Sequence, residues 1–585
     1  MTKKVAWACG DVIRFKTQTI LISEEFGGVS MSVLQPERGR PTPKRTFNRW
    51  VQNPVLEDYA LRYAPKSFRR WSEWTVMNSA LGGIAYMADF AIGGSVVLAY
   101  GFANAVTSIL VVAAIIFLTG LPIAYYSAKY NIDMDLLTRG AGFGYYGSTL
   151  TSLVYASFTF IYFSLEGSVM AQALEEFFHI PLPVGYLICS LVIIPLVMFG
   201  MTALSKLQVV TQPIWLVLML GPFVAIALRD PSAFSQWTHF GGASASGSHF
   251  SPIEFGLAAG VTLSLIAQIG EQVDYLRFMP NLTPQNRSKW WLAVLLAGPG
   301  WVILGAMKQL GGSLLASWIA PTMGTKAADE PINMYTQAFH VVIGNSYAAL
   351  ALATFFVLLS QIKINVTNAY SGSLSWSNFF SRIFHTHPGR VVWLFLNVGI
   401  ALGLMEAGVF GFLNTVLGFY SNLAVAWIGA VVSDLVINKG LLKISPSYIE
   451  FKRGHLYNFN PVGFGSMILA AGISIAAFFG AFGPVMQAYS PFLSLVLAFV
   501  LAPVIAIVTR GKYYIARENT FEKSDRHHDG HRHSELPAEF TCASCGFEYE
   551  KMDMLYCPFH KAPICSLCCS LESKCHDLCK AGHVH

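Results

Sequence analysis

The stretch SQIKINVTNAYSGSLSWSN, from Ser360 to Asn378, lies inside a long apolar segment and decides how the rest of the chain is interpreted. It places amides and the ammonium of Lys363 at membrane depth, where a charged side chain costs roughly 2.5–3.5 kcal/mol on insertion scales. On a helix, the i, i+4, i+7 spacing puts four of its residues on one face: Gln361, Asn365, Asn368 and Gly372. Such a face looks into a helix bundle, either as a site or as polar contact between helices. Lys363 is too far from both ends of the segment to snorkel, which favours a functional or charge-pairing role.

The composition is typical of a polytopic membrane protein. The chain has 585 residues, of which 54% are hydrophobic and 12% are charged, with 42 Phe and 50 Gly. No secretory signal peptide is expected, because the start MTKKVAWACGDVIRFK has no apolar run before a cleavage site. The net charge of +6 predicts no nucleic-acid partner, since Lys and Arg next to anionic lipid account for it.

Apolar runs of about 20 residues are long enough to cross a hydrocarbon core of roughly 30 Å. Twelve such spans are expected, at residues 73–97, 102–126, 143–174, 181–200, 208–228, 253–277, 290–316, 339–376, 391–406, 409–437, 462–482 and 491–509. With both termini in the cytoplasm, the loops on that side hold most of the Lys and Arg, as the positive-inside rule requires. The bilayer itself is the expected surrounding, in a plasma membrane or a bacterial inner membrane.

Glycines interrupt two of these spans. The first span contains Gly82-Gly83, and the sixth contains Gly260 and Gly270. If spans one to five and six to ten are inverted repeats, the interruptions correspond, and unwound backbone there offers carbonyls to a cation and N–H groups to an anion. The alternative is that these glycines serve close helix packing.

Spans three and six carry polar residues at depth. Tyr162 and Glu166 are four residues apart and share a helix face, where a ring beside a carboxylate suits a flat heterocycle. Alternatively, Glu166 lies near the outer interface. Gln268 is deep in span six and is a further ligand candidate.

Three other charges are given structural interpretations. Asp274 and Arg277, at i and i+3, are interpreted as an interfacial salt bridge. Lys308, after the Gly298-Pro299-Gly300 break, is either a second buried charge or a snorkelling residue, and we favour snorkelling.

Several stretches resemble the nucleobase-cation symporter family, which includes hydantoin, allantoin and cytosine permeases. They lie in the family's order, between about residues 54 and 515: EDYALRYAPKSFRRWSEW, LLTRGAGFGYYGS, VDYLRFMPN, NVTNAYSGSLSWSN and SDLVINKGLLK. The resemblance implies an all-α fold with the five-plus-five inverted repeat of the LeuT type and two extra helices. It also implies a central site for a small planar ring compound.

The resemblance implies roles for individual residues. The family's aromatic and amide pair in span three is similar to Tyr162 and Glu166, so this chain has an acid where an amide is usual. The family's polar ligands in spans six and eight are similar to Gln268 and to the region of Asn365 and Asn368, and Gly82-Gly83 lies at the implied break.

The most informative departure is in span eight. In sodium-coupled members, the hydroxyl pair that binds sodium resembles the position held here by Lys363-Ile364. Lysine has three donors and no acceptor lone pair, so it cannot ligate a cation. Our hypothesis is that the Lys363 ammonium replaces sodium, with Glu166 as a counter-charge, and that proton coupling stays open.

The end of the chain is a different module. A histidine tract (His527, His528, His531 and His533) precedes it, and eight of the ten cysteines then follow within about forty residues: Cys542, Cys545, Cys557, Cys565, Cys568, Cys569, Cys575 and Cys579. Paired CxxC elements in a reducing compartment are typical of structural zinc, with His560 and His576 nearby and ligands enough for two ions. An iron–sulfur cluster is the alternative, and no cofactor is expected in the membrane portion.

The run YCPFHKAPICSLCCSLESKCHDLCK resembles the cysteine-rich linker of bacterial sensor histidine kinases that carry a transporter-like membrane domain. Two functions follow, a permease for a nucleobase-like heterocycle or a sensory receptor that signals through the zinc tail to a kinase, and we favour the permease. An enzyme is not expected, because no nucleophile-base spacing appears within the membrane portion. The expected division of the chain is 1–70 as a cytoplasmic segment, 71–510 as a twelve-helix transporter-like domain, 511–540 as a His-rich linker and 541–580 as the metal-binding module.

Overall fold

A computed structural model describes residues 60–518 and 539–583, shorter pieces at 45–47, 51 and 56–58, and three strands between residues 11 and 34. In this part of the chain, nine helices are long and apolar enough to cross a membrane. The protein is therefore a multi-pass membrane protein of the all-α class. The expected histidine tract and most of the expected linker lie outside the described residues.

The first half of the bundle contains spans one to five. Its helices are α2 (Glu73–Gly82), η2 (Gly83–Ala85), α3 (Ala88–Tyr130), α5 (Ser148–Phe178), α6 (Leu182–Met198) and α7 (Gly200–Arg229), with the short α4 (Met134–Thr138) and η3 (Arg139–Phe143) between α3 and α5. Helix α3 holds the end of span one and all of span two, because Gly101 turns the chain between them with a φ of +73°.

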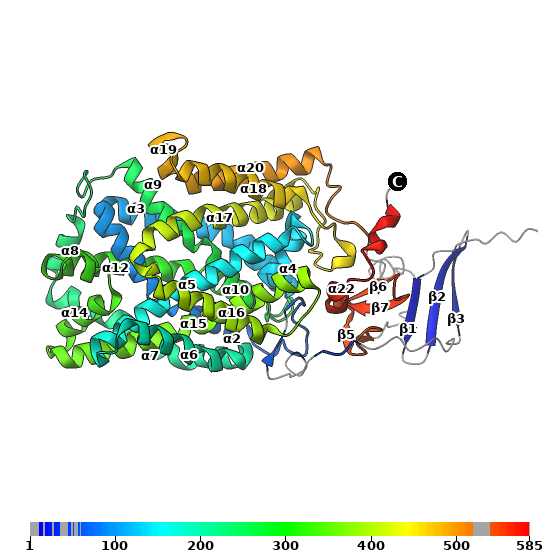
Figure 1. The fold of residues 1–585 in the computed structure, drawn as a ribbon, viewed down its shortest axis with the longest axis horizontal. Coiled ribbons are helices and arrows are strands. Elements are labelled where there is room, and N and C mark those ends of the chain that lie inside the picture. The colour runs from blue at the N-terminus through cyan, green and yellow to red at the C-terminus, as the bar shows by residue number, and fades with distance from the viewer. Residues whose placement is uncertain are drawn as a thin grey trace, which may run out of the picture.

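The second half contains spans six to ten. Its helices are α9 (Pro252–Thr262), η4 (Leu263–Gln268), α10 (Ile269–Leu276), α11 (Arg287–Ala297), α12 (Trp301–Met323), α15 (Ser346–Phe384), α16 (Arg390–Glu406) and α17 (Leu413–Ser433). Two further helices, α18 (Pro461–Phe478) and α20 (Ser490–Val508), pack on one flank of the bundle, at the top of Figure 1.

All twelve expected spans fall on these helices. The largest boundary error is in span eight, which was expected at 339–376, whereas α15 begins at Ser346 and continues to Phe384. A separate helix, α14 (Pro331–Ile343), precedes it and ends at Gly344, whose φ is +74°. The side chain of Asn345 then caps α15, so a C-terminal glycine and an N-cap separate two helices that hydropathy alone had merged.

The breaks expected in spans one and six are both present. Between α2 and α3 the chain leaves helical geometry at Ile84, with φ of −83° and ψ of 21°. Between α9 and α10 it narrows to the 3₁₀ segment η4. Interrupted helices at corresponding positions of two repeats mark the usual place of a transporter site.

Helices α3 and α12 approach each other closely through glycines. A Cβ on Gly93 would lie 1.9 Å from the carbonyl oxygen of Gln309, and a Cβ on Gly312 would lie 2.1 Å from that of Phe90. Small residues allow this backbone contact, which places the side chains of α12 against the break in span one.

We therefore expect Gly312→Val to destabilise the bundle, because backbone cannot move aside for the added side chain. Overpacking of this kind costs about 1–3 kcal/mol or more. The measurement is the melting temperature of the purified protein in detergent. Gly399→Val is the matched control, since a Cβ at Gly399 meets nothing within 4 Å; equal melting temperatures for the two variants would contradict the expectation.

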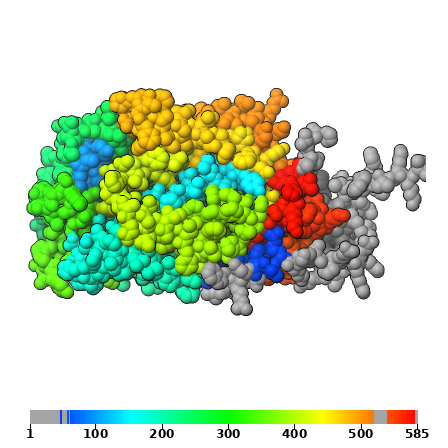
Figure 2. Space-filling view, viewed as in Figure 1, coloured from blue at the N-terminus to red at the C-terminus, as the bar shows by residue number. Residues whose placement is uncertain are grey.

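A small cysteine-rich module follows the bundle. It contains β4 (Glu539–Thr541) paired with β5 (Glu548–Glu550), and β6 (Met554–Cys557) paired with β7 (Ala562–Cys565), both antiparallel, then α22 (Ser566–Leu571). Figure 1 shows the module at one end of the bundle, beside an antiparallel sheet of β1 (Asp11–Phe15), β2 (Gln18–Glu25) and β3 (Gly28–Leu34). Figure 2 shows it packed against that end of the bundle. We call the surface that the module contacts there, which includes Arg62, Tyr63, Arg453 and Asn458, the module face.

Candidate functional site

The polar face of α15 lies in the middle of the bundle. Gln361, Asn365 and Asn368 have 0% exposure, and Gly372, the fourth residue of the predicted face, is also buried. The sequence expectation that this face looks inward is therefore confirmed. Spans one, three and six contact it around the break between α2 and α3.

Glu166 on α5 lies at this break. Its carboxyl oxygens accept the N–H groups of Met87 and Ala88 at 3.2 Å and the side-chain amide of Gln361 at 2.6 Å. Met87 and Ala88 begin the second half of span one, where the N-terminal N–H groups of a helix are free and favour an acidic partner. The side chain is fully buried at this break, which favours a role in a site over that of an ordinary polar residue near the outer interface.

Tyr162 and Gln268 lie near Glu166 but have their own partners. The Tyr162 hydroxyl lies 2.7 Å from the Ser264 hydroxyl in η4, so span three meets the break of span six. Gln268 donates to Glu271 at 2.8 Å. The four broken or polar spans named from the sequence thus converge.

Within the part of the chain that the structure describes, several polar atoms in this region are buried without a hydrogen-bond partner. They include one carboxyl oxygen of Glu271, the amide nitrogen of Asn365 and the amide oxygen of Asn368. The other amide atoms of the two asparagines bond each other at 3.2 Å. Buried polar groups are nearly always paired, so free donors and acceptors here are suited to a polar ligand.

Lys363 points away from the break. Its ammonium donates to the carbonyl of Gln208 at 3.1 Å and to the hydroxyl of Thr211 at 2.8 Å, both on α7. Glu166 is held by span one and Gln361 instead. The predicted pairing of Lys363 with Glu166 is therefore wrong, because Lys363 lies on the side of α15 that faces α7. Its predicted role in place of a sodium ion stays a prediction.

The snorkelling interpretation of Lys308 is also wrong. Lys308 is 1% exposed, and its ammonium donates to the carbonyls of Ile84 at 2.7 Å and Tyr86 at 2.9 Å. It also lies 3.0 Å from a carboxyl oxygen of Asp89. The close approach of α12 to α3 brings it to the break in span one.

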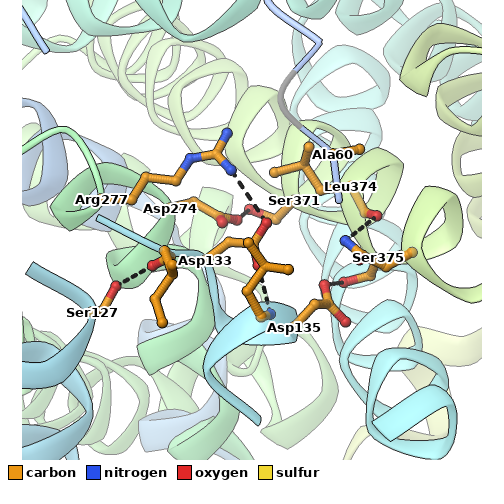
Figure 3. Close-up of polar contacts among 12 residues, drawn as sticks. Ala60, Ser127, Asp133, Asp135, Asp274, Arg277, Ser371, Leu374 and Ser375 are labelled. Carbon is orange, nitrogen blue, oxygen red and sulfur yellow. Dashed lines mark hydrogen bonds and ion pairs between the residues drawn. The ribbon is translucent and has the colours of Figure 1, made fainter. Parts of the chain in front are cut away.

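A second buried polar layer lies between this site and the module face. The expected bridge between Asp274 and Arg277 is replaced by other partners: Arg277 pairs with Asp133 at 3.3 Å, and Asp274 accepts the Ser371 hydroxyl at 2.6 Å. Figure 3 shows these contacts together with that of Ser375 and Asp135. The predicted i, i+3 bridge is therefore wrong, because Asp274 contacts α15 and Arg277 contacts the loop after α3.

Sequence reasoning missed Asp133 and Asp135 in this layer, and it missed Asp89 at the break in span one. Asp133 and Asp135 follow directly after the second span, and Asp89 lies within the first, and all three are at most 3% exposed. Their charge inside or beside an apolar run was the available signal.

The tail contains a group that could hold a metal ion. The sulfur atoms of Cys542, Cys545, Cys565 and Cys568 lie within 4.8 Å of one another, and all four residues are buried. Two CxxC pairs thus form one site, as their spacing predicts.

The other four tail cysteines do not join this group. Burial raises the pKa of Cys569 to about 12, against the opposing effect of Arg453, so this thiol is neutral. Among the described residues no second group of metal-ligating side chains as close as the first is found. Binding by Cys557, Cys569, Cys575 and Cys579 stays a prediction.

The module is tied to the segment before α2. Arg62 pairs with Asp553 at 2.8 Å and lies 4.3 Å above the ring of Tyr549, whose hydroxyl is 3.5 Å from the sulfur of Cys545. The Tyr63 hydroxyl bonds Glu550. The cysteine group therefore lies two contacts away from Arg62, in the segment before span one.

A second set of contacts ties the module to the loop before α18. Arg453 pairs with Asp577 at 3.0 Å and donates to the carbonyl of Glu572 at 2.6 Å. Lys580 donates to the side chain of Asn458 at 2.8 Å. The module is thus part of the folded protein rather than a free tail.

Comparison with solved structures gives the fold. The chain is similar to Mhp1, a nucleobase-cation-symport-1 family transporter, in a closed conformation with bromovinylhydantoin bound, with a TM-score of 0.55, 16% identity, and coverage of 79% of this chain and 99% of that one. The inward-facing conformation of Mhp1 gives a TM-score of 0.54 and 18% identity over 81% and 99% of the two chains.

A third solved structure is less similar to this chain and has the same fold. A substrate-bound, outward-open sodium-coupled sialic acid symporter gives a TM-score of 0.50 and 13% identity over 78% of this chain and 93% of that one. No protein-family model and no curated protein sequence matches the chain. The LeuT-type fold with two extra helices, expected from the resemblance, is confirmed.

Proposed function

We propose that this protein is a secondary transporter that moves a nucleobase-like small heterocycle by alternating access, without sodium coupling. The observation that carries the proposal is the broken span one, whose free N–H groups meet Glu166 and Gln361 in the middle of the bundle. Broken helices at the centre of inverted repeats form the sites of such transporters.

The substrate class follows from the groups available. Unpaired amide atoms of Asn365 and Asn368 can face the N–H and C=O edge of a planar ring. The buried rings of Phe158 and Tyr162, 4.5 Å apart at their centroids, supply an apolar surface next to Glu166. The hydantoin bound in the compared Mhp1 structure is a compound of this kind. The compared structures are transporters, and none supports the sensory alternative.

Two further parts of the proposal concern the module. We propose that the Cys542 group binds a structural zinc ion, because four buried cysteines from two CxxC pairs match zinc's tetrahedral preference. We also propose that the module face is cytoplasmic, since Arg62, Lys452 and Arg453 gather there and thiolate sites need a reducing compartment.

Liposome uptake tests the proposed function. Purified protein in liposomes is given labelled hydantoins, purines and pyrimidines, with a sodium gradient, a proton gradient or none. We expect one compound to enter without any need for sodium, and Asn365→Ala to lower its uptake at least tenfold, about 1.4 kcal/mol. Saturable binding with no uptake under any gradient would contradict transport, and uptake only with sodium would contradict the proposed coupling.

A further inference from the structure

The ammonium of Lys308 is surrounded by oxygen atoms from span one. It lies 2.7 Å from the Ile84 carbonyl and 2.9 Å from the Tyr86 carbonyl, which the break leaves outside regular helical geometry. A carboxyl oxygen of Asp89 lies 3.0 Å away. The ring of Tyr86 adds its face, with the ammonium 3.6 Å from the centroid.

Main-chain carbonyls at a helix break are ligands that transporters use for a monovalent cation, and a carboxylate adds further acceptor oxygens with a negative charge. Here the cation is the end of a side chain. We propose that Lys308 is a tethered cation that permanently fills a monovalent cation site formed by the break of span one and Asp89.

The surroundings hold this arrangement in place. Gln309, the next residue on α12, donates to the second carboxyl oxygen of Asp89 at 2.8 Å. The close glycine contacts of α3 and α12 fix the two backbones against each other. Because Asp89 and Lys308 are at most 1% exposed, neither charge has water as a substitute partner.

This inference rests on the proposed function and explains why transport would not be coupled to sodium. It attributes the lack of coupling to Lys308, whereas the sequence had suggested Lys363. Lys363 contacts α7, whereas Lys308 contacts the carbonyls of span one. A tethered ammonium cannot be released with the substrate, so this site cannot pass sodium across the membrane.

The inference predicts that removing the ammonium creates a sodium site. The variant Lys308→Ser keeps Asp89 and both carbonyls and adds a hydroxyl, which is a sodium ligand. The probe is sodium alone: binding of radioactive Na⁺ to purified protein, and melting temperature in NaCl compared with choline chloride. No transported compound is needed, so failure here is distinguishable from failure of the uptake assay.

We expect the wild-type protein to bind no sodium and to melt at the same temperature in both salts. Lys308→Ser should bind about one sodium ion per chain and melt several degrees higher in NaCl, because a ligand of the folded state stabilises it. The double variant Asp89→Asn, Lys308→Ser should lose both effects, since its site lacks the carboxylate.

Three results would overturn the inference. One is sodium binding by the wild-type protein that Asp89→Asn abolishes. Another is a Lys308→Ser variant with equal stability in both salts and no bound sodium. If Lys308→Ser is not recovered folded, Lys308→Gln is measured in its place, with the same expected result. The third contradicting result is that neither variant can be recovered folded, to the same extent in NaCl and in choline chloride.

Discussion

Replacing Cys565 by serine is expected to empty the metal site of the tail and to release the module from the module face. Cys565 lies at the end of β7, and its sulfur is one of the four that could hold the proposed zinc ion. Structural zinc contributes roughly 10–16 kcal/mol of apparent binding free energy in small domains, far more than this module's short strands and single short helix provide. Losing one ligand should therefore unfold the module.

The measurement is metal content by mass spectrometry together with limited proteolysis. The wild-type protein should contain at least one zinc ion per chain and resist cleavage after residue 538, whereas Cys565→Ser should contain about one ion less and be cut there. Cys189→Ser is the matched control, because Cys189 is a buried cysteine of α6, outside the module. Equal zinc content in Cys565→Ser and the wild type would show that the metal is held elsewhere.

Replacing Glu166 by alanine is expected to abolish uptake and to destabilise the bundle. Its carboxyl group is the partner of two main-chain N–H groups and of the Gln361 amide, all buried. Each orphaned donor costs about 1–3 kcal/mol, so the loss should lower the melting temperature strongly. Glu166→Gln, which keeps the shape and one acceptor oxygen, should lie between alanine and wild type in stability.

Melting temperature in detergent and uptake in liposomes measure the two effects separately. Glu406→Ala is the control, because Glu406 is an exposed carboxylate at the end of α16. A Glu166→Ala protein with wild-type uptake would remove Glu166 from the site. Normal uptake by Glu166→Gln would show that hydrogen bonding matters there and the charge does not.

The spans and their breaks could be predicted from the sequence because hydropathy and glycine act locally. Two glycine-containing breaks lie at or next to helix ends in the structure: Gly82-Gly83 and Gly298-Pro299-Gly300. The inward face of α15 was also predictable, since its polar residues share a helical period. The cysteine group followed from two CxxC spacings.

Charge partners could not be predicted in the same way. Lys308 and Asp89 are 219 residues apart and meet because glycines on two helices let their backbones approach. Arg277 pairs with Asp133, in the loop after α3, and not with Asp274, which is three residues away in the sequence. Asp274 instead accepts a hydrogen bond from Ser371 on α15. Packing, which a single sequence does not show, decides these pairs.

The long sequence separation of Arg62 and Asp553 limits when their contact can form during synthesis of the chain. The two residues are 491 positions apart in the chain. At a synthesis rate of about 5–20 residues per second, the segment before span one waits roughly 25–100 s before its partner exists. The membrane helices can be inserted during that time, because all twelve expected spans lie between the two residues. The contact of the module with the segment before span one therefore forms only after these helices have been synthesised.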